Sequence, residues 1–206
     1  MTTHAQTHLH SERAAKLIAL AMIVVVLTQI TYLTLKSEVV TGKLIWGVEA
    51  FAFSAIAVLA LLQLERGSAS ALVPPLAWAS LSLFGLVNLF QVGIGLTMFG
   101  PLGDAGEVLG PVMGAVLAFA FFLYFTGKVL VGVAAIAIGL PLLKADSGAA
   151  QLIGGVCALA GLAALALNAT GMVMGMDVVT AAGAAGTAAT LFVAIALLIM
   201  PYSANT

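Results

Sequence analysis

The hydrophobic residues of this chain gather in long stretches without charged side chains, separated by short polar segments. Five such stretches cover residues 17–35, 44–64, 74–99, 150–173 and 179–201. Each is close to the ~20 residues that a helix needs to cross the hydrocarbon core of a bilayer, and Glu49 is the one charged residue inside them. The pattern therefore predicts an all-α fold, a polytopic bundle of transmembrane helices.

A sixth stretch, residues 109–144, is longer than the others and carries Lys128 near its middle. A single helix of this length would run about 54 Å against a hydrocarbon core of about 30 Å. A break at Thr126–Lys128 would instead leave two segments of about 15 residues, both short for a crossing. We therefore predict one long helix and six spans in all.

An internal similarity supports the alternative of seven spans. Residues 41–53 and 126–138 share seven of thirteen positions. As a true repeat, they would place a helix start at Lys128, as at Lys43, and give the three-plus-three inverted repeat found in secondary transporters. Chance similarity is the other explanation, because the chain is rich in Ala, Gly and Val and the flanking segments align poorly.

The short loops predict the orientation of the chain. We expect residues 1–12 to form a polar tail, 13–201 a single transmembrane bundle, and 202–206 a short C-terminal tail. With six spans, the basic residues on the side of the termini are Arg13, Lys16, Arg66 and Lys144, and those on the opposite side are Lys36 and Lys43. The positive-inside rule then predicts a multi-pass protein of the cell (inner) membrane with both termini in the cytoplasm.

Composition supports a lipid environment and excludes several functions. Charged residues make up 7% of the 206 residues and hydrophobic residues 63%, with a mean hydropathy of +1.20, whereas soluble domains carry roughly 25% charged residues. The net charge of −1 gives no basic field for nucleic acid. The chain has a single cysteine, Cys157, and its three histidines all lie in the first ten residues. We therefore expect no cofactor and no metal site, and the absence of a catalytic constellation argues against an enzyme without excluding one.

Two ionisable residues inside the predicted spans are the first candidates for a functional site. A charged side chain near the bilayer centre costs about 2.5–3.5 kcal/mol on translocon scales, so Glu49 and Lys128 need a reason to be there. As a buried pair they would neutralise each other, and a carboxylate in a dry site is the usual chemistry of proton-coupled transport. A structural ion pair, or a shallow Glu49 with a snorkelling Lys128, is the alternative.

Side-chain amides inside the spans extend this candidate set. Gln29, Asn88, Gln91 and Asn168 need hydrogen-bond partners in lipid, and such bonds contribute about 0.6 kcal/mol on average. With Glu49 and Lys128, they could line a path for a solute or ion, or they could simply join helices. The glycine pairs Gly110/Gly114 and Gly171/Gly175 have the GxxxG spacing that predicts close helix packing.

Two functions fit these residues. The first is binding or transport of a small solute or a proton through the helix bundle. The second is a non-catalytic structural or assembly subunit that contacts another membrane protein, or a second copy of itself, through its Gly-rich and Ala-rich faces.

Overall fold

The chain folds into a bundle of α-helices. The computed structural model describes residues 2–35, 39–66 and 73–200, and in these ranges it contains no strand. The elements in chain order are α1 (Thr2–Leu35), α2 (Val39–Arg66), α3 (Pro75–Asp104), the 3-10 helix η1 (Gly106–Leu109), α4 (Gly110–Leu142), α5 (Gly148–Met174), the 3-10 helix η2 (Gly175–Val178) and α6 (Val179–Ile199).

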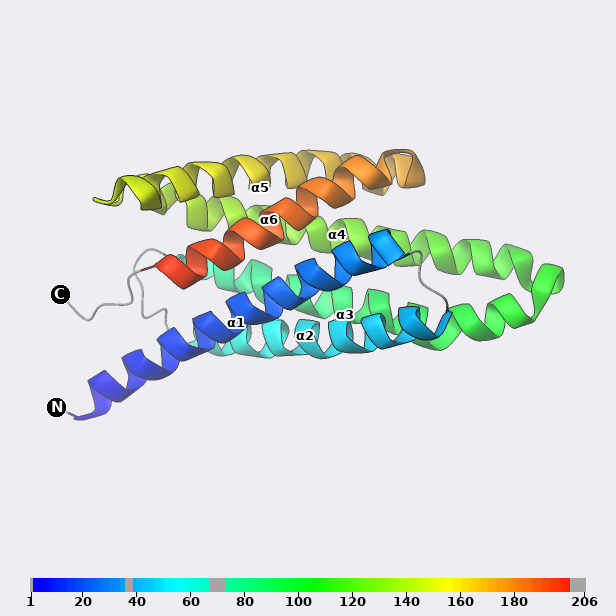
Figure 1. Cartoon of the computed structure of the whole chain (residues 1–206), viewed down its shortest axis with the longest axis horizontal. Coiled ribbons are helices and arrows are strands. Elements are labelled where there is room, and N and C mark those ends of the chain that lie inside the picture. Colours follow the sequence, from blue (N-terminus) through cyan, green and yellow to red (C-terminus); the bar gives the residue numbers. More distant parts are fainter. Residues whose placement is uncertain (1, 36–38, 67–72, 201–206) are drawn as a thin grey trace.

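Each helix packs against the next one in the chain, and α6 returns to α1, so that the bundle closes on itself (Figure 1). In addition, α4 contacts α6. The start of α1 and the end of α6 lie at the same end of the bundle, here called the terminal end. The opposite end, where α1 ends and α2 begins, is called the distal end. Pro75 starts α3 and Gly175, with φ +66°, ends α5, as their backbone preferences require.

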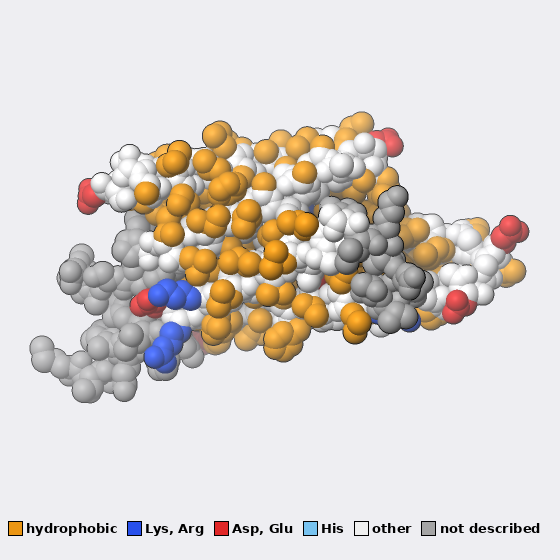
Figure 2. Space-filling view, viewed as in Figure 1, with side chains coloured by type: hydrophobic (Ala, Val, Ile, Leu, Met, Phe, Trp, Pro, Cys, Tyr) orange, Lys and Arg blue, Asp and Glu red, His pale blue; other side chains and the backbone are white. Residues whose placement is uncertain are grey.

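The helices are those of a membrane protein. Five helical stretches are long and apolar enough to cross a bilayer: Ser11–Tyr32, Gly42–Glu65, Pro75–Asp104, Gly106–Leu142 and Gly148–Ile199. The last stretch includes both α5 and α6, which fold back on one another through η2. Apolar side chains cover the sides of the bundle, and the visible acidic and basic side chains lie toward its two ends (Figure 2). The all-helical architecture is confirmed, while a count of six crossings stays a prediction.

The break that seven spans would require is absent, because α4 runs without interruption from Gly110 to Leu142. Lys128 lies in the middle of this helix, whereas Lys43 lies near the start of α2, so the two similar segments occupy different positions. Gly127, which precedes Lys128 in this segment, serves close packing between α3 and α4. A methyl group at Gly127 would collide with the side-chain amide of Asn88, so this residue allows α3 to approach α4.

The described N-terminal residues are helical. α1 begins at Thr2, so residues 2–12 are continuous with the first helix, and the division of the chain into tails and bundle stays a prediction. The predicted C-terminal tail, 202–206, lies outside the described residues.

Close helix packing uses other glycines than the GxxxG spacing predicted. A methyl group at Gly139 would lie 2.6 Å from the carbonyl oxygen of Gly154, and one at Gly132 would lie 2.8 Å from that of Gly161. These contacts bring the backbones of α4 and α5 together. In contrast, a methyl group at Gly110 or Gly114 would meet no atom within 4 Å; Gly175 belongs to the turn after α5, and Gly171 packs on the Phe125 ring. Within the chain, Gly110 and Gly114 therefore make no close helix contact, while packing of these glycines between two copies of the chain stays a prediction.

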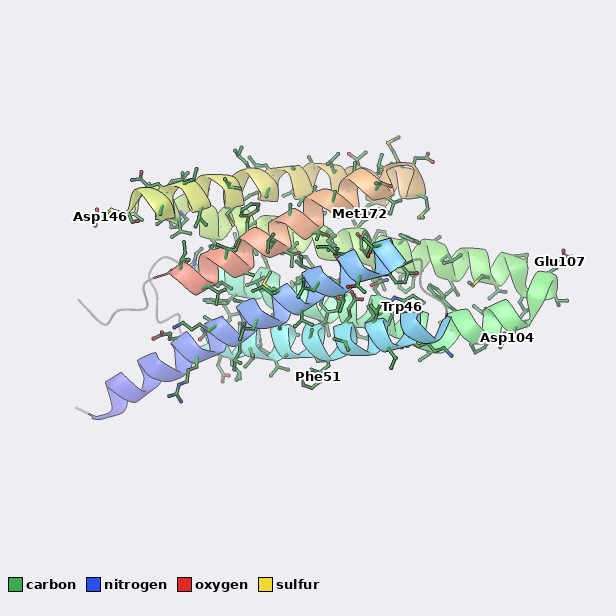
Figure 3. All side chains as sticks on the ribbon, in the orientation of Figure 1. Trp46, Phe51, Asp104, Glu107, Asp146 and Met172 are labelled. Carbon is green, nitrogen blue, oxygen red and sulfur yellow. The ribbon has the colours of Figure 1, made fainter. Side chains whose placement is uncertain are left out.

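The hairpin formed by α3 and α4 extends past the other helices at the distal end (Figure 1). Its tip carries the exposed acids Asp104 and Glu107 (Figure 3). Its sides are apolar, with Val108 87% and Phe119 56% exposed. We call this feature the α3–α4 hairpin.

Candidate functional site

Polar side chains from four helices meet inside the bundle. They are Thr28 and Gln29 of α1, Glu49 of α2, Lys128 of α4 and Thr187 of α6, and they are here called the core cluster. Thr187 lies eight residues from the start of α6 and twelve from its end. At 1.5 Å per residue, these distances are about 12 Å and 18 Å, which places Thr187 well inside α6.

Lys128 is fully buried and held by a side-chain amide. Its Nζ donates a hydrogen bond of 2.9 Å to Oε1 of Gln29, and the hydroxyl of Thr187 donates one of 2.7 Å to the same oxygen. The Nζ also lies 5.4 Å from the centre of the Tyr124 ring, within the range of a cation–π interaction. Among the described residues, the ammonium thus has one hydrogen-bond acceptor and one aromatic face for its three N–H groups.

Glycines of α6 make room for these side chains. A methyl group at Gly186 would collide with Cδ of Lys128 and lie 2.7 Å from its Cγ. A methyl group at Gly183, one turn earlier, would lie 2.7 Å from the Tyr124 hydroxyl. The long side chains of α4 therefore lie along a strip of α6 that has no side chains of its own.

Glu49 is 6% exposed and has a hydroxyl as its partner. Oγ1 of Thr28 lies 2.8 Å from Oε1 of Glu49 and also 2.9 Å from the backbone oxygen of Val25. A hydroxyl carries one proton and can accept further bonds. If Glu49 is ionised, the Thr28 hydroxyl donates a hydrogen bond to the carboxylate. If Glu49 is protonated, the acid donates to Thr28, whose own proton turns to Val25.

The direct ion pair that the sequence analysis considered between Glu49 and Lys128 is not formed. Within the described ranges, the one ion pair shorter than 4 Å joins Lys16 and Glu12 on the exposed surface. Glu49 and Lys128 attract each other at longer range only. Each of the two side chains bonds to α1 instead, Glu49 to Thr28 and Lys128 to the next residue, Gln29.

The remaining predicted residues are distributed over the bundle. Asn88 is 1% exposed, bonds to the Phe84 carbonyl of its own helix and lies against Gly127, next to Lys128 in α4. Asn168 joins α5 to α6 by donating to the Ala182 carbonyl and has no hydrogen bond to the core cluster among the described residues.

Gln91 is half-buried and makes no side-chain hydrogen bond within the described part of the chain. Of the six candidates, the structure thus links Gln29 to Lys128 directly and brings Glu49 to the neighbouring Thr28. It does not join all six into one continuous line.

Several residues of the site were missed by sequence reasoning. Thr187, Tyr124 and Gly186 complete the surroundings of Lys128. A hydroxyl one residue after a glycine in an Ala-rich helix, as in Gly186-Thr187, was the available signal. A second buried polar link was also missed: Ser11 and Gln63 exchange hydrogen bonds of 2.6 and 2.7 Å between α1 and α2 near the terminal end.

An aromatic cluster lies on the distal side of Glu49. The Trp46 ring, one turn before Glu49, lies 6.0 Å from the Tyr32 ring of α1 and 5.7 Å from the Phe99 ring of α3. A methyl group at Gly95 would lie 3.1 Å from the Trp46 ring, so this glycine lets the indole enter the α2–α3 interface. We call Tyr32, Trp46 and Phe99 the aromatic cluster.

Comparisons with protein-family models, curated proteins and solved structures found no match for this chain. Function is therefore inferred from the chemistry of the core cluster.

Proposed function

We propose that this protein is a multi-pass membrane protein that binds and transports a proton or a small solute through its helix bundle, with Glu49 as the exchanging group. The observation that carries the proposal is the Glu49–Thr28–Val25 arrangement, which offers a hydrogen bond to Glu49 in both protonation states. A carboxyl group that gains and loses a proton inside a bundle needs such a partner, because an unpaired polar group in lipid is costly.

Lys128 has a supporting role in this proposal. Its positive charge balances the carboxylate without a direct bond, so Glu49 stays free to change its protonation state. Gln29, which accepts from Lys128 and follows Thr28 in the chain, connects the two halves of the core cluster through the backbone of α1.

Proton flux into proteoliposomes, followed with a trapped pH-sensitive dye under an imposed potential, tests the proposal. We expect flux with the wild-type protein and a loss of about 100-fold with Glu49→Gln, the size of effect typical of a positioned proton-transfer group. Glu65→Gln is the matched control, because Glu65 is an exposed carboxylate on the same helix. Equal flux through both variants, or none through the wild type, would contradict a proton-transport function.

A second candidate function is supported by the α3–α4 hairpin. Its apolar sides and acidic tip extend beyond the helices around it, so that part of the hairpin is left uncovered by this chain and is free to contact another membrane protein. In this case the chain would be a structural or assembly subunit of a membrane complex, bound to another membrane protein or to a second copy. Native mass spectrometry of the protein extracted in mild detergent distinguishes the two, since a lone chain would contradict the subunit role.

Location and orientation belong to the same proposal. We expect the inner membrane, with the terminal end in the cytoplasm, because the predicted basic residues are more numerous there. Reporter fusions at the C-terminus that are active on one side of the membrane test this orientation.

A further inference from the structure

The two routes from Glu49 to water are closed in different ways. Glu49 lies seven residues after Gly42, where the apolar stretch of α2 begins, and sixteen residues before Glu65, where it ends. The corresponding distances along the helix are about 10 Å to the distal end and about 24 Å to the terminal end. The distal route is therefore much the shorter.

The route to the terminal end is closed by backbone packing. Phe53, one turn after Glu49, is 1% exposed, and its ring packs edge-on against Phe84 of α3 at 5.5 Å. Beside it, a methyl group at Gly85 would lie 2.6 Å from the carbonyl oxygen of Phe53. Two backbones this close leave no path unless the helices separate, and the bonds between Ser11 and Gln63 hold α1 against α2 further on.

Among the described residues, side chains are what closes the route to the distal end. The aromatic cluster lies between Glu49 and the distal end along the helices, and in it Tyr32 is 41% exposed and Trp46 is half-buried. No hydrogen bond of the described residues fixes these three rings. Rotation of the Trp46 side chain out of its contact with Gly95 is a much smaller change than separation of two helices.

We infer that Glu49 exchanges with the distal side of the membrane, through a route that the Trp46 side chain closes. This inference rests on the proposed function and adds its direction: in this conformation the proton or small solute reaches Glu49 from the side opposite the termini. Trp46 is a gating residue in this scheme and takes no part in binding the proton.

Chemical labelling from each side tests the route. Glu49→Cys is made in a Cys157→Ser background, because Cys157 is the single native cysteine. Sealed vesicles of each orientation are treated with a membrane-impermeant methanethiosulfonate. Cysteines at Ser147 and Thr180, which are exposed near the terminal and the distal ends, report the orientation of the vesicles.

We expect slow labelling of residue 49 from the distal side and none from the terminal side. Trp46→Ala should accelerate distal labelling by about tenfold, which corresponds to about 1.4 kcal/mol less opening free energy. Phe51→Ala is the control, because Phe51 is an aromatic residue of the same helix that is 80% exposed and points away from the bundle (Figure 3). Labelling from the terminal side, or equal rates for Trp46→Ala and Phe51→Ala, would overturn the inference.

A second measurement avoids mutation of Glu49. A water-soluble carbodiimide is added to the same vesicles, and modification of the native carboxyl group is read by peptide mass spectrometry. Distal modification that increases in Trp46→Ala supports the route even if Glu49→Cys does not fold. Distal access without proton flux would refute proton transport and leave the route standing, whereas flux without distal access would refute the route alone.

Discussion

The long helix α4 has two very different interfaces. Toward α5 it packs backbone on backbone, through Gly139 against Gly154 and Gly132 against Gly161. Toward α1 and α6 it presents Lys128, which is held by hydrogen bonds to side chains. In lipid, helices associate through close van der Waals packing and hydrogen bonds, because the hydrophobic effect does not drive them together. α4 thus uses close backbone packing toward α5 and side-chain hydrogen bonds toward α1 and α6.

The difference separates a rigid part of the bundle from an adaptable one. Backbone atoms in contact allow no rearrangement, since any change of the α4–α5 distance breaks many contacts at once. Side-chain hydrogen bonds around Gln29 can be exchanged without moving a helix. A site that changes its protonation state belongs on the adaptable side, which is where the core cluster lies.

The largest effect is expected from filling the glycine interface. Gly139→Leu would force α4 and α5 apart, and overpacking of this kind costs about 3 kcal/mol at the upper end of its usual range. Unfolding in SDS-containing mixed micelles, followed by circular dichroism, measures the loss. Gly114→Leu is the control in the same helix, where no neighbouring atom lies within reach, and should leave stability nearly unchanged. Similar losses for both variants would remove the distinction between the interfaces.

A smaller effect is expected on the polar side. Gln29→Leu removes the one hydrogen-bond acceptor that the described residues offer Lys128, and hydrogen bonds to charged groups contribute about 2 kcal/mol. In the double variant, Lys128→Met also removes the ammonium group that Gln29→Leu leaves without this acceptor. The double variant should therefore be less destabilised than the sum of the two single variants. Strict additivity would show that the two side chains do not interact.

The smallest effect is expected at the edge of the core cluster. Thr187→Val keeps the shape of the side chain and removes one donor to Gln29, which should cost about 0.6 kcal/mol, the average for such bonds between membrane helices. Thr170→Val is its control, because the Thr170 hydroxyl bonds within its own helix and is exposed. A loss for Thr187→Val no larger than for Thr170→Val would place Thr187 outside the cluster.

The sequence predicted the helices well because lipid imposes a simple rule. A segment that crosses a bilayer must satisfy its backbone internally and carry few charges, so the uncharged stretches coincide closely with the helices. The long segment 109–144 was correctly predicted as one helix, observed as Gly110–Leu142. A glycine in such a helix can mark either a break in the helix or a close contact with a neighbouring helix, and Gly127 makes a close contact with α3.

The site was harder to predict, because it depends on which helices become neighbours. Glu49 and Lys128 were identified as unusual from their position in the spans, but they form no direct pair, since each bonds to a different residue of α1, Thr28 and Gln29. Gln29 was identified, yet its bond to Thr187, 158 positions away, depends on the return of α6 to α1. No local sequence pattern predicts that α6 packs against α1.

The length of the α3–α4 hairpin has a consequence for the lipid around the protein. α4 has 33 residues and α6 has 21, so their lengths are about 50 Å and 31 Å. Wherever the hairpin is not covered by another protein, its apolar sides meet a hydrocarbon layer thinner than the helix is long. Such mismatch costs a fraction of a kcal/mol per Å and is relieved by tilting of the helix or local thickening of the bilayer. The protein should therefore deform the membrane unevenly, more beside α3 and α4 than beside α6, and favour thicker bilayers over thin ones.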